Sequence, residues 1–383
     1  MSKMVRACCV FALVALGNVQ AESMRVATWG GVYGDVYQTQ VLQSFVRSEQ
    51  AGSSSVGPVS VSQPGSRPPD AVELSLHEAM QGCASGELML LPPTSIDAMQ
   101  KVSSYLPNAV QPCSIGQWAW ATVAGFSRDI FPDHAPQPAL AADFFNTTDF
   151  PGKRALRRTP RVIVEWALAA SGVPANRTYD ALQQIDDVWP LIARQLRQLE
   201  GQVLWVDSDA EALEHLRNGT VTLAMVSSNS VLNEAIASGR HPGVVWDAAV
   251  IELSMLAIPV KAPDPERSTK LLRYVSDSKN TLEFAAALGF SPVGFEAVDL
   301  LNSEYRQYLA AASGNYRNGI WGDSVWWRSA AGAQMTSRFA EWTERLQSLD
   351  SLVMADPDAI VSAAGDVLSR VPARGDLFTD ANF

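Results

Sequence analysis

Two long apolar runs constrain the fold of this chain more than any other feature. They are Trp118–Phe126, WAWATVAGF, and Glu252–Val260, ELSMLAIPV. Each has the length and composition of a β-strand that passes from one half of a molecule into the other. Between them, candidate strands alternate with candidate helices, which predicts α/β layers around a mainly parallel sheet. Because 383 residues are enough for two domains, we expect the chain to leave one lobe, build a second and return.

The first βα unit is predicted at Met24–Gly34, MRVATWGGVYG. A short apolar strand meets Trp29, two glycines permit a sharp turn, and an apolar helix face begins at Tyr33. Amide groups at the start of such a helix readily hold small ligands. This stretch is therefore either an ordinary βα unit with a packed tryptophan or one in which Trp29 or Tyr33 lines a ligand cleft.

The N-terminus has the pattern of a cleavable secretory signal peptide over residues 1–21. Lys3 and Arg6 precede the short apolar stretch Ala7–Leu16, and small residues lie at the −3 and −1 positions of a site after Ala21. Removal of these two basic residues takes the formal net charge from −11 to −13. An acidic chain without a basic cluster argues against nucleic-acid binding. The export signal predicts a periplasmic protein.

The mature chain would keep two cysteines, Cys83 and Cys113. In an oxidising compartment an isolated pair usually forms a disulfide, which we favour over two buried free thiols. Neither these cysteines nor the four scattered histidines have metal-ligand spacing. We therefore expect no metal and no other cofactor.

Several stretches, taken in order, resemble one family, the periplasmic solute-binding proteins of spermidine/putrescine-type ABC transporters. The resemblance runs from about Met24 to Arg345, and both cysteines fall where one branch of the family often carries a pair. The stretches that carry it are ATWGGVYGD, DFPGKRALRRTP with VEWALAASGV, LRNGTVTLAM, VVWDAAV, MLAIPVKAPDPERSTKLLRYV and SRFAEW.

The resemblance implies a two-lobed α/β periplasmic-binding-protein fold of type II, with two mixed sheets, flanking helices and a hinge of crossing strands. Lobe 1 would comprise residues 22–121 and about 255–310, and lobe 2 residues 122–254. A C-terminal helical segment of about 311–350, with Met335, Phe339 and Trp342 on one face, would pack on the lobes. Residues 351–383 form an extension outside the resemblance.

The same resemblance implies a binding protein and not an enzyme. It would capture a small polar solute, with a polyamine such as putrescine or spermidine as the implied class, and deliver it to an inner-membrane ABC permease. The sequence departs from the polyamine pattern at two places, because Ser228 and Ser254 stand where such binders carry an aromatic ring and a carboxylate. Glu252, two residues before Ser254 on the same strand face, is the acid expected to compensate.

Eight residues are the candidate ligand contacts, chosen at strand ends, at the crossings and within family-matching turns. They are Trp29, Tyr33, Ser75, His77, Glu165, Asn229, Asp247 and Glu252. His77 is equally interpreted as a solvated loop residue. Glu165 lies on an apolar helix face and needs a partner, either a ligand cation or one of Arg154, Arg157 and Arg161.

Two other functional classes remain open from the sequence. An exported ligand-sensing module that signals through a receptor would share the fold and the cleft, so sequence does not separate it from transport. An exported hydrolase is disfavoured because the chain has neither a Gly-x-Ser-x-Gly elbow nor a His-Glu-x-x-His pair.

Overall fold

The computed structural model describes residues 23–51, 57–61, 67–94, 96–312 and 314–355. The expected signal peptide and most of the C-terminal extension lie outside the described residues. The strands, in chain order, are β1 (Met24–Ala27), β2 (Val59–Val61), β3 (Ala71–Ser75), β4 (Val110–Gln111), β5 (Ser114–Phe126), β6 (Arg154–Arg157), β7 (Val203–Val206), β8 (Leu223–Ser227), β9 (Gly243–Ala257), β10 (Ser291–Pro292) and β11 (Ile320–Trp321).

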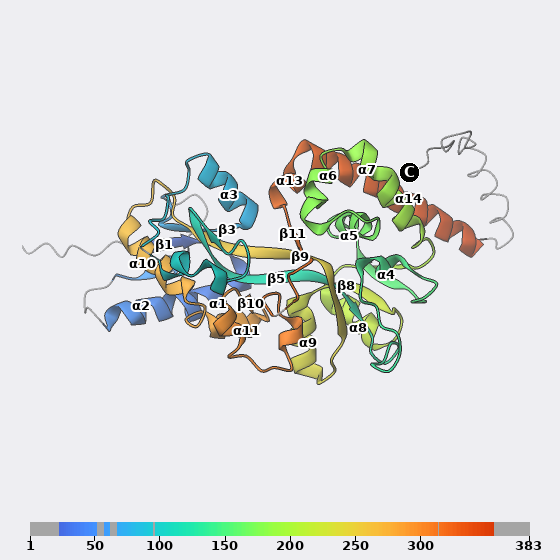
Figure 1. Ribbon diagram of the computed structural model, residues 1–383, viewed down its shortest axis with the longest axis horizontal. Helices are drawn as coiled ribbons and strands as arrows, with labels where there is room; N and C mark the ends of the chain where they lie inside the picture. Colours follow the sequence, from blue (N-terminus) through green and yellow to red (C-terminus); the bar gives the residue numbers. More distant parts are fainter. Residues whose placement is uncertain (1–22, 52–56, 62–66, 95, 313, 356–383) are drawn as a thin grey trace, which may run out of the picture.

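Helices cover the sheet in both halves of the molecule, as Figure 1 shows. They are α1 (Gly31–Tyr37), α2 (Gln43–Gln50), α3 (Leu76–Ala84), α4 (Ala141–Phe145), α5 (Ile163–Ala170), α6 (Thr178–Ala181), α7 (Ile185–Arg197), α8 (Asp209–Arg217), α9 (Ser228–Ser238), α10 (Pro265–Ser276), α11 (Leu282–Leu288), α12 (Phe295–Val298), α13 (Ser324–Arg328) and α14 (Ala330–Ala355). A π-helical turn, Gln38–Leu42, joins α1 to α2. No helix in the described ranges is long and apolar enough to cross a membrane.

The strands form one hydrogen-bonded sheet with the order β2-β1-β3-β9-β5-β8-β6-β7. The half that contains β1, β2 and β3 is called lobe 1 here, and the half that contains β6, β7 and β8 is called lobe 2. The antiparallel pair β5 and β9 runs through both lobes (Figure 1). The two sheets expected from the sequence are therefore the two ends of one sheet. The predicted residue boundaries of the lobes stay a prediction.

Each crossing strand differs in extent from its prediction. β5 begins at Ser114, four residues before the predicted start, and β9 spans Gly243–Ala257 as a single strand. Its pairing with β5 shifts register between Thr122 and Ala124. At this bulge Ala248 has a positive φ of 53° and its carbonyl accepts a hydrogen bond from Trp166 Nε1 at 3.1 Å. Bulges bend a strand and increase its twist, so β9 turns where it passes between the lobes.

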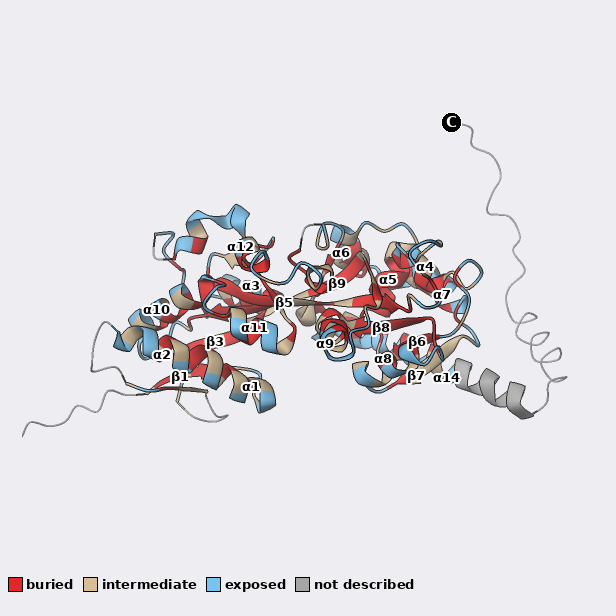
Figure 2. Ribbon diagram, turned by 90° about the horizontal axis from the view of Figure 1, so that it is seen from below, coloured by how far each residue is buried: buried red, intermediate tan, exposed pale blue. Residues whose placement is uncertain are grey.

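Each lobe has its own apolar core beside the sheet. In lobe 1, Tyr37, Trp118 and Phe284 pack ring against ring, with Trp118 and Phe284 centroids 4.4 Å apart. In lobe 2, Phe144 and Trp166 belong to a second cluster with ring centroids 5.1 Å apart. Figure 2 shows buried residues along the sheet in both halves. A third cluster contains both Leu76 of α3 and Leu213 of α8, so a shared core along the crossing strands connects the two lobes.

The C-terminal helix α14 packs on lobe 2. Met335, Phe339 and Trp342 are buried, as their spacing predicts, and Trp205 of β7 lies against Phe339 and Trp342. The predicted N-cap at Asp264 is also present, because its side chain accepts from Arg267 N and Pro265 follows it. Amphipathic spacing and capping chemistry identified both helices from local sequence alone.

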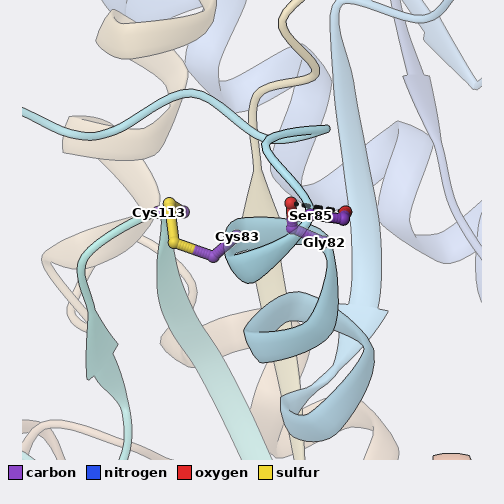
Figure 3. The surroundings of a disulfide bond; sticks show 4 residues. All are labelled: Gly82, Cys83, Ser85 and Cys113. Carbon is purple, nitrogen blue, oxygen red and sulfur yellow. Dashed lines mark hydrogen bonds between the residues drawn. A yellow bond between two sulfur atoms is a disulfide. The ribbon is translucent and has the colours of Figure 1, made fainter.

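The predicted disulfide is present between Cys83 and Cys113, whose Cα atoms lie 5.7 Å apart. It joins the end of α3 to the segment just before β5 (Figure 3). Beside it, Ser85 Oγ donates to the Gly82 carbonyl oxygen at 3.2 Å and closes the last turn of α3. The disulfide therefore fixes α3 to the base of a crossing strand.

Candidate functional site

A cavity of about 720 Å³ lies between the two lobes, with the crossing strands as its floor. Lobe 1 contributes Trp29 and the start of α3, and lobe 2 contributes the ends of β6 and β8. The lining residues are Trp29, Ser75, Glu78, Trp120, Thr122, Arg157, Thr159, Arg161, Val162, Glu165, Asp209, Met225, Ser227, Asn229, Val250, Glu252, Phe290, Ser324 and Arg328. Five of the eight predicted contacts are among them: Trp29, Ser75, Glu165, Asn229 and Glu252.

Trp29 forms the aromatic wall of the cavity on the lobe 1 side. Gly30 and Gly31 have φ values of 73° and 58°, which only glycine adopts without strain. They turn the chain so that the Trp29 side chain is 46% exposed. Its ring lies edge-on to Trp120, with centroids 5.3 Å apart. The two indoles offer apolar and cation–π surface to a ligand.

Tyr33 lies behind Trp29 and does not line the cavity. Its ring centroid is 5.4 Å from that of Trp29, and its hydroxyl donates to the carboxylate of Glu73. Glu73 also accepts a hydrogen bond from Ser254 Oγ, and its Oε2 is buried without a hydrogen-bond partner. Burial raises the pKa of Glu73 to about 7. A polar network that the sequence did not predict thus lies directly beneath the aromatic wall.

Glu252 is the half-buried acid at the floor of the cavity. It is opposite Trp120 in the β5–β9 pairing, and its Oε1 accepts from Arg161 Nη2 at 3.1 Å. A Cβ at Gly322 would come within 2.4 Å of Glu252 Oε1, so a larger residue there would force this carboxylate to move. Burial raises the pKa of Glu252 to about 7; Arg161 opposes the shift and nearby acids, chiefly Glu165, reinforce it. Burial thus disfavours the charged form of this acid, and a further cation beside it would favour that form.

Glu165 lines the cavity but is held by neutral donors. Its Oε1 accepts from Tyr179 OH at 2.8 Å and from Trp327 Nε1 at 2.9 Å. Its Oε2 accepts from the Val162 N–H at 2.7 Å. None of the three arginines considered from the sequence is its partner. Arg154 binds carbonyl oxygens, including that of Phe150, while Arg157 and Arg161 pair with other acids.

The start of α3 faces the segment that contains α13. Ser75 caps α3, and its hydroxyl lies 2.7 Å from Ser324 Oγ. His77 does not line the cavity, because its Nδ1 is 3.0 Å from the Gly322 carbonyl oxygen and its ring lies against α13. Glu78, which sequence reasoning missed, pairs with Arg328 at 2.8 Å. These contacts connect lobe 1 with the segment that leads into α14.

Lobe 2 supplies a positively charged group at the end of β6. Arg157 lies 3.3 Å from Asp209 Oδ1, while its Nε is buried and has no hydrogen-bond partner. Asn229 and Ser227 line the cavity beside it, at the start of α9. No side-chain cap covers the first turn of α9, and helix N-termini favour anions. Asp209 accepts from the Ser227 N–H at 3.1 Å, so this side of the cavity holds a guanidinium group and a carboxylate side by side.

Asp247 lies at the bulge of β9, away from the cavity lining. Its two oxygens accept from the Ala141 N–H, at 2.8 Å, and from the Asn318 side chain. Ser228, at the position where polyamine binders carry an aromatic ring, is buried and accepts from the Ala121 N–H. Both residues hold backbone in place and do not face the cavity.

The lining residues that were not predicted come from chain segments that meet only in the folded protein. Arg157 ends β6 and Arg161 lies in the loop after it, and Ser324 and Arg328 come from α13, about 250 residues after α3. Trp120 carried a signal, since it alternates with Trp118 on a crossing strand. Four carboxylates and three guanidinium groups line the cavity together. Within the residues that the structure describes, no group of three or more His, Cys, Asp or Glu side chains could hold a metal ion.

Comparison with known proteins agrees with this architecture. The model of the family described as bacterial extracellular solute-binding protein matches residues 44–313. A gamma-aminobutyric acid-binding protein of Pseudomonas aeruginosa is 24% identical over 349 residues, which cover 87% of this chain and 94% of that protein.

Two solved structures have similar folds. The Atu4243 GABA receptor superposes with a TM-score of 0.64 at 20% identity, covering 84% of this chain and 97% of the other. The spermidine/putrescine substrate-binding protein PotD of Streptococcus pneumoniae superposes with a TM-score of 0.62 at 11% identity, covering 86% of this chain and 99% of the other. At these identities the likeness establishes the two-lobed α/β binding-protein fold predicted from the sequence.

Proposed function

The chain belongs to the bacterial extracellular solute-binding proteins, which serve ABC transporters as receptors and not as enzymes, and we propose that its cleft captures a small zwitterion of the ω-amino-acid class. The observation that carries this proposal is that one cavity holds a buried guanidinium Nε without a partner and, on its floor, an acid whose charged form burial disfavours. Arg157 Nε is buried without a partner, and Glu252, whose pKa burial raises to about 7, would be stabilised in its charged form by a nearby ammonium group. A ligand with one carboxylate and one ammonium group would satisfy both.

In the proposed complex, the ligand carboxylate lies against Arg157 and the first turn of α9. Asn229, which lines the same part of the cavity, would donate a further hydrogen bond. The ammonium group lies near Glu252, and the methylene groups lie along the indoles of Trp29 and Trp120. Charge-assisted hydrogen bonds at both ends would select the length of the ligand as well as its charge.

A polyamine is the competing ligand class, since the cavity has one more acid than base. It would leave Arg157 Nε without an acceptor, however, and would bring ammonium groups close to three guanidinium groups. Like-charge contacts of this kind disfavour binding. The relative from Pseudomonas aeruginosa is named for a zwitterion, gamma-aminobutyric acid, which supports the same choice. We further propose periplasmic capture, after removal of residues 1–21, and delivery to an inner-membrane permease.

Calorimetry of the mature protein with gamma-aminobutyrate, putrescine and spermidine tests the ligand class. We expect one-to-one binding of gamma-aminobutyrate, and weaker or no binding of the two polyamines. Arg157→Met should weaken gamma-aminobutyrate binding and leave any binding of putrescine unchanged or stronger, because only the zwitterion uses the guanidinium group. Spermidine binding that is tighter than gamma-aminobutyrate binding, and insensitive to Arg157→Met, would assign the protein to the polyamines.

A further inference from the structure

The N-terminus of α5 contains a strained residue at the edge of the cleft. Val162 has φ 77° and ψ −53°, a conformation that costs free energy for any residue with a branched Cβ. It lines the cavity, as do Arg161 before it and Glu165 after it. Such a conformation persists only when surrounding contacts enforce it.

Glu165 supplies the contact that enforces this conformation. Its Oε2 accepts the Val162 N–H at 2.7 Å, and its side chain is buried. Its Oε1 accepts from Tyr179 of α6 and Trp327 of α13. Protein donors therefore contact both oxygens, so the carboxylate is already held in place before any ligand binds.

The strained turn determines where Arg161 points. Arg161 directly precedes Val162, and its Nη2 reaches Glu252 Oε1 at 3.1 Å across the floor of the cavity. A relaxed Val162 with negative φ would rotate the peptide that carries Arg161 and redirect its side chain. The position of Arg161 thus depends on the hydrogen bond between Val162 and Glu165.

We propose that Glu165 is a positioning residue that holds the strained turn at Val162 and so presents Arg161 to the ligand and to Glu252. This role rests on the proposed ligand cleft but differs from direct contact between Glu165 and a ligand ammonium group. It also connects the cleft to the C-terminal segment, because Trp327 donates to the same carboxylate.

Glu165→Gln is the informative substitution. A glutamine amide has one acceptor oxygen and one NH₂ group, whereas the site presents three donors. With its oxygen accepting from Tyr179 and Trp327, its NH₂ would face the Val162 N–H, which cannot accept a hydrogen bond. The turn at Val162 should then relax and redirect Arg161. Affinity for gamma-aminobutyrate should fall about tenfold, the scale of one weakened ionic contact between Arg161 and the ligand.

A double-mutant cycle separates positioning from direct contact. If Glu165 acts through Arg161, Glu165→Gln should lower the affinity for gamma-aminobutyrate less than about twofold when Arg161 is already replaced by methionine. In the matched Arg157→Met variant, Glu165→Gln should still lower this affinity about tenfold. Arg157 is held by Asp209 and not by the turn at Val162. A direct ligand contact would instead cost the same factor in all three backgrounds, and that result would overturn the proposal.

A ligand-free structure of Glu165→Gln keeps this test independent of the proposed ligand. We expect Val162 to adopt a negative φ and the Arg161–Glu252 ion pair to be lost. If Val162 and the ion pair are unchanged, the positioning role is wrong, whatever the ligand is. If they change but gamma-aminobutyrate does not bind the wild-type protein, the ligand assignment fails and the positioning role stands.

Discussion

Glu73 accepts a hydrogen bond from Ser254 across the β3–β9 pair, so a carboxylate lies beside the serine that occupies the acidic position of the polyamine pattern. This carboxylate belongs to Glu73 of the neighbouring strand β3 and lies beneath Trp29. It does not line the cavity. Tyr33 donates to the same oxygen. The acid is therefore used to support the aromatic wall and is not available to grip an amine.

This network predicts that the stability of the protein depends on pH. The pKa of Glu73 is raised by burial to about 7 in the folded protein, so its contribution is fully present below the unfolded value of about 4.5 and is lost as pH rises through about 7. Glu73→Gln should remove this loss, which is at most about 3 kcal/mol. Urea denaturation of both proteins at pH 5 and pH 8 measures it.

The matched control for this experiment is Glu266→Gln, which changes an exposed side chain of α10. We expect the stability difference between this variant and the wild type to be the same at both pH values. If the stability difference between Glu73→Gln and the wild type were also the same at pH 5 and pH 8, the prediction would be wrong.

Loss of the Cys83–Cys113 disulfide should destabilise the mature protein by roughly 3–4 kcal/mol, because the bond closes a long loop in the unfolded chain. The cysteines are 30 residues apart in sequence. Denaturation of a Cys83→Ala/Cys113→Ala variant against the wild type measures the difference. Ligand affinity should not change, since neither cysteine lines the cavity; a large loss of affinity in the folded variant would show that α3 needs this anchor.

Trp29 and Trp118 form a matched pair that separates binding from stability. Trp29 is 46% exposed in the cavity, whereas Trp118 is fully buried in the core of lobe 1. Trp29→Ala should weaken ligand binding by about 1–2 kcal/mol with little change in unfolding. Trp118→Ala should cost about 3–5 kcal/mol of stability. Calorimetry and urea denaturation of both variants check the contrast, and equal effects on stability would refute it.

Export should produce a protein that begins near Glu22. Mass spectrometry of the periplasmic fraction should give the mass of residues 22–383 less two hydrogens, because the two remaining cysteines are bonded. A mass that includes Lys3 and Arg6, or two thiols that react with an alkylating reagent, would contradict processing or pairing respectively.

The sequence by itself determined the α/β class, the existence of both crossing strands, the capped helix after Asp264 and the apolar face of α14. Each of these follows from local chemistry: runs of apolar residues, periodicity and caps. Local patterns also placed Trp29 and Glu252 in the cavity, because a glycine turn and a crossing strand are positions near any cleft between lobes.

Only the tertiary structure decided how the polar side chains are paired. Glu165 meets Tyr179 and Trp327, Ser75 meets Ser324, and Glu73 meets Ser254, across separations from 14 to 249 residues. An acid placed by sequence can face a ligand, an arginine or a neutral donor, and its local pattern is the same in every case. The choice depends on which distant donors the fold brings within hydrogen-bonding distance, since such bonds act over about 3 Å while chain order leaves that proximity undetermined.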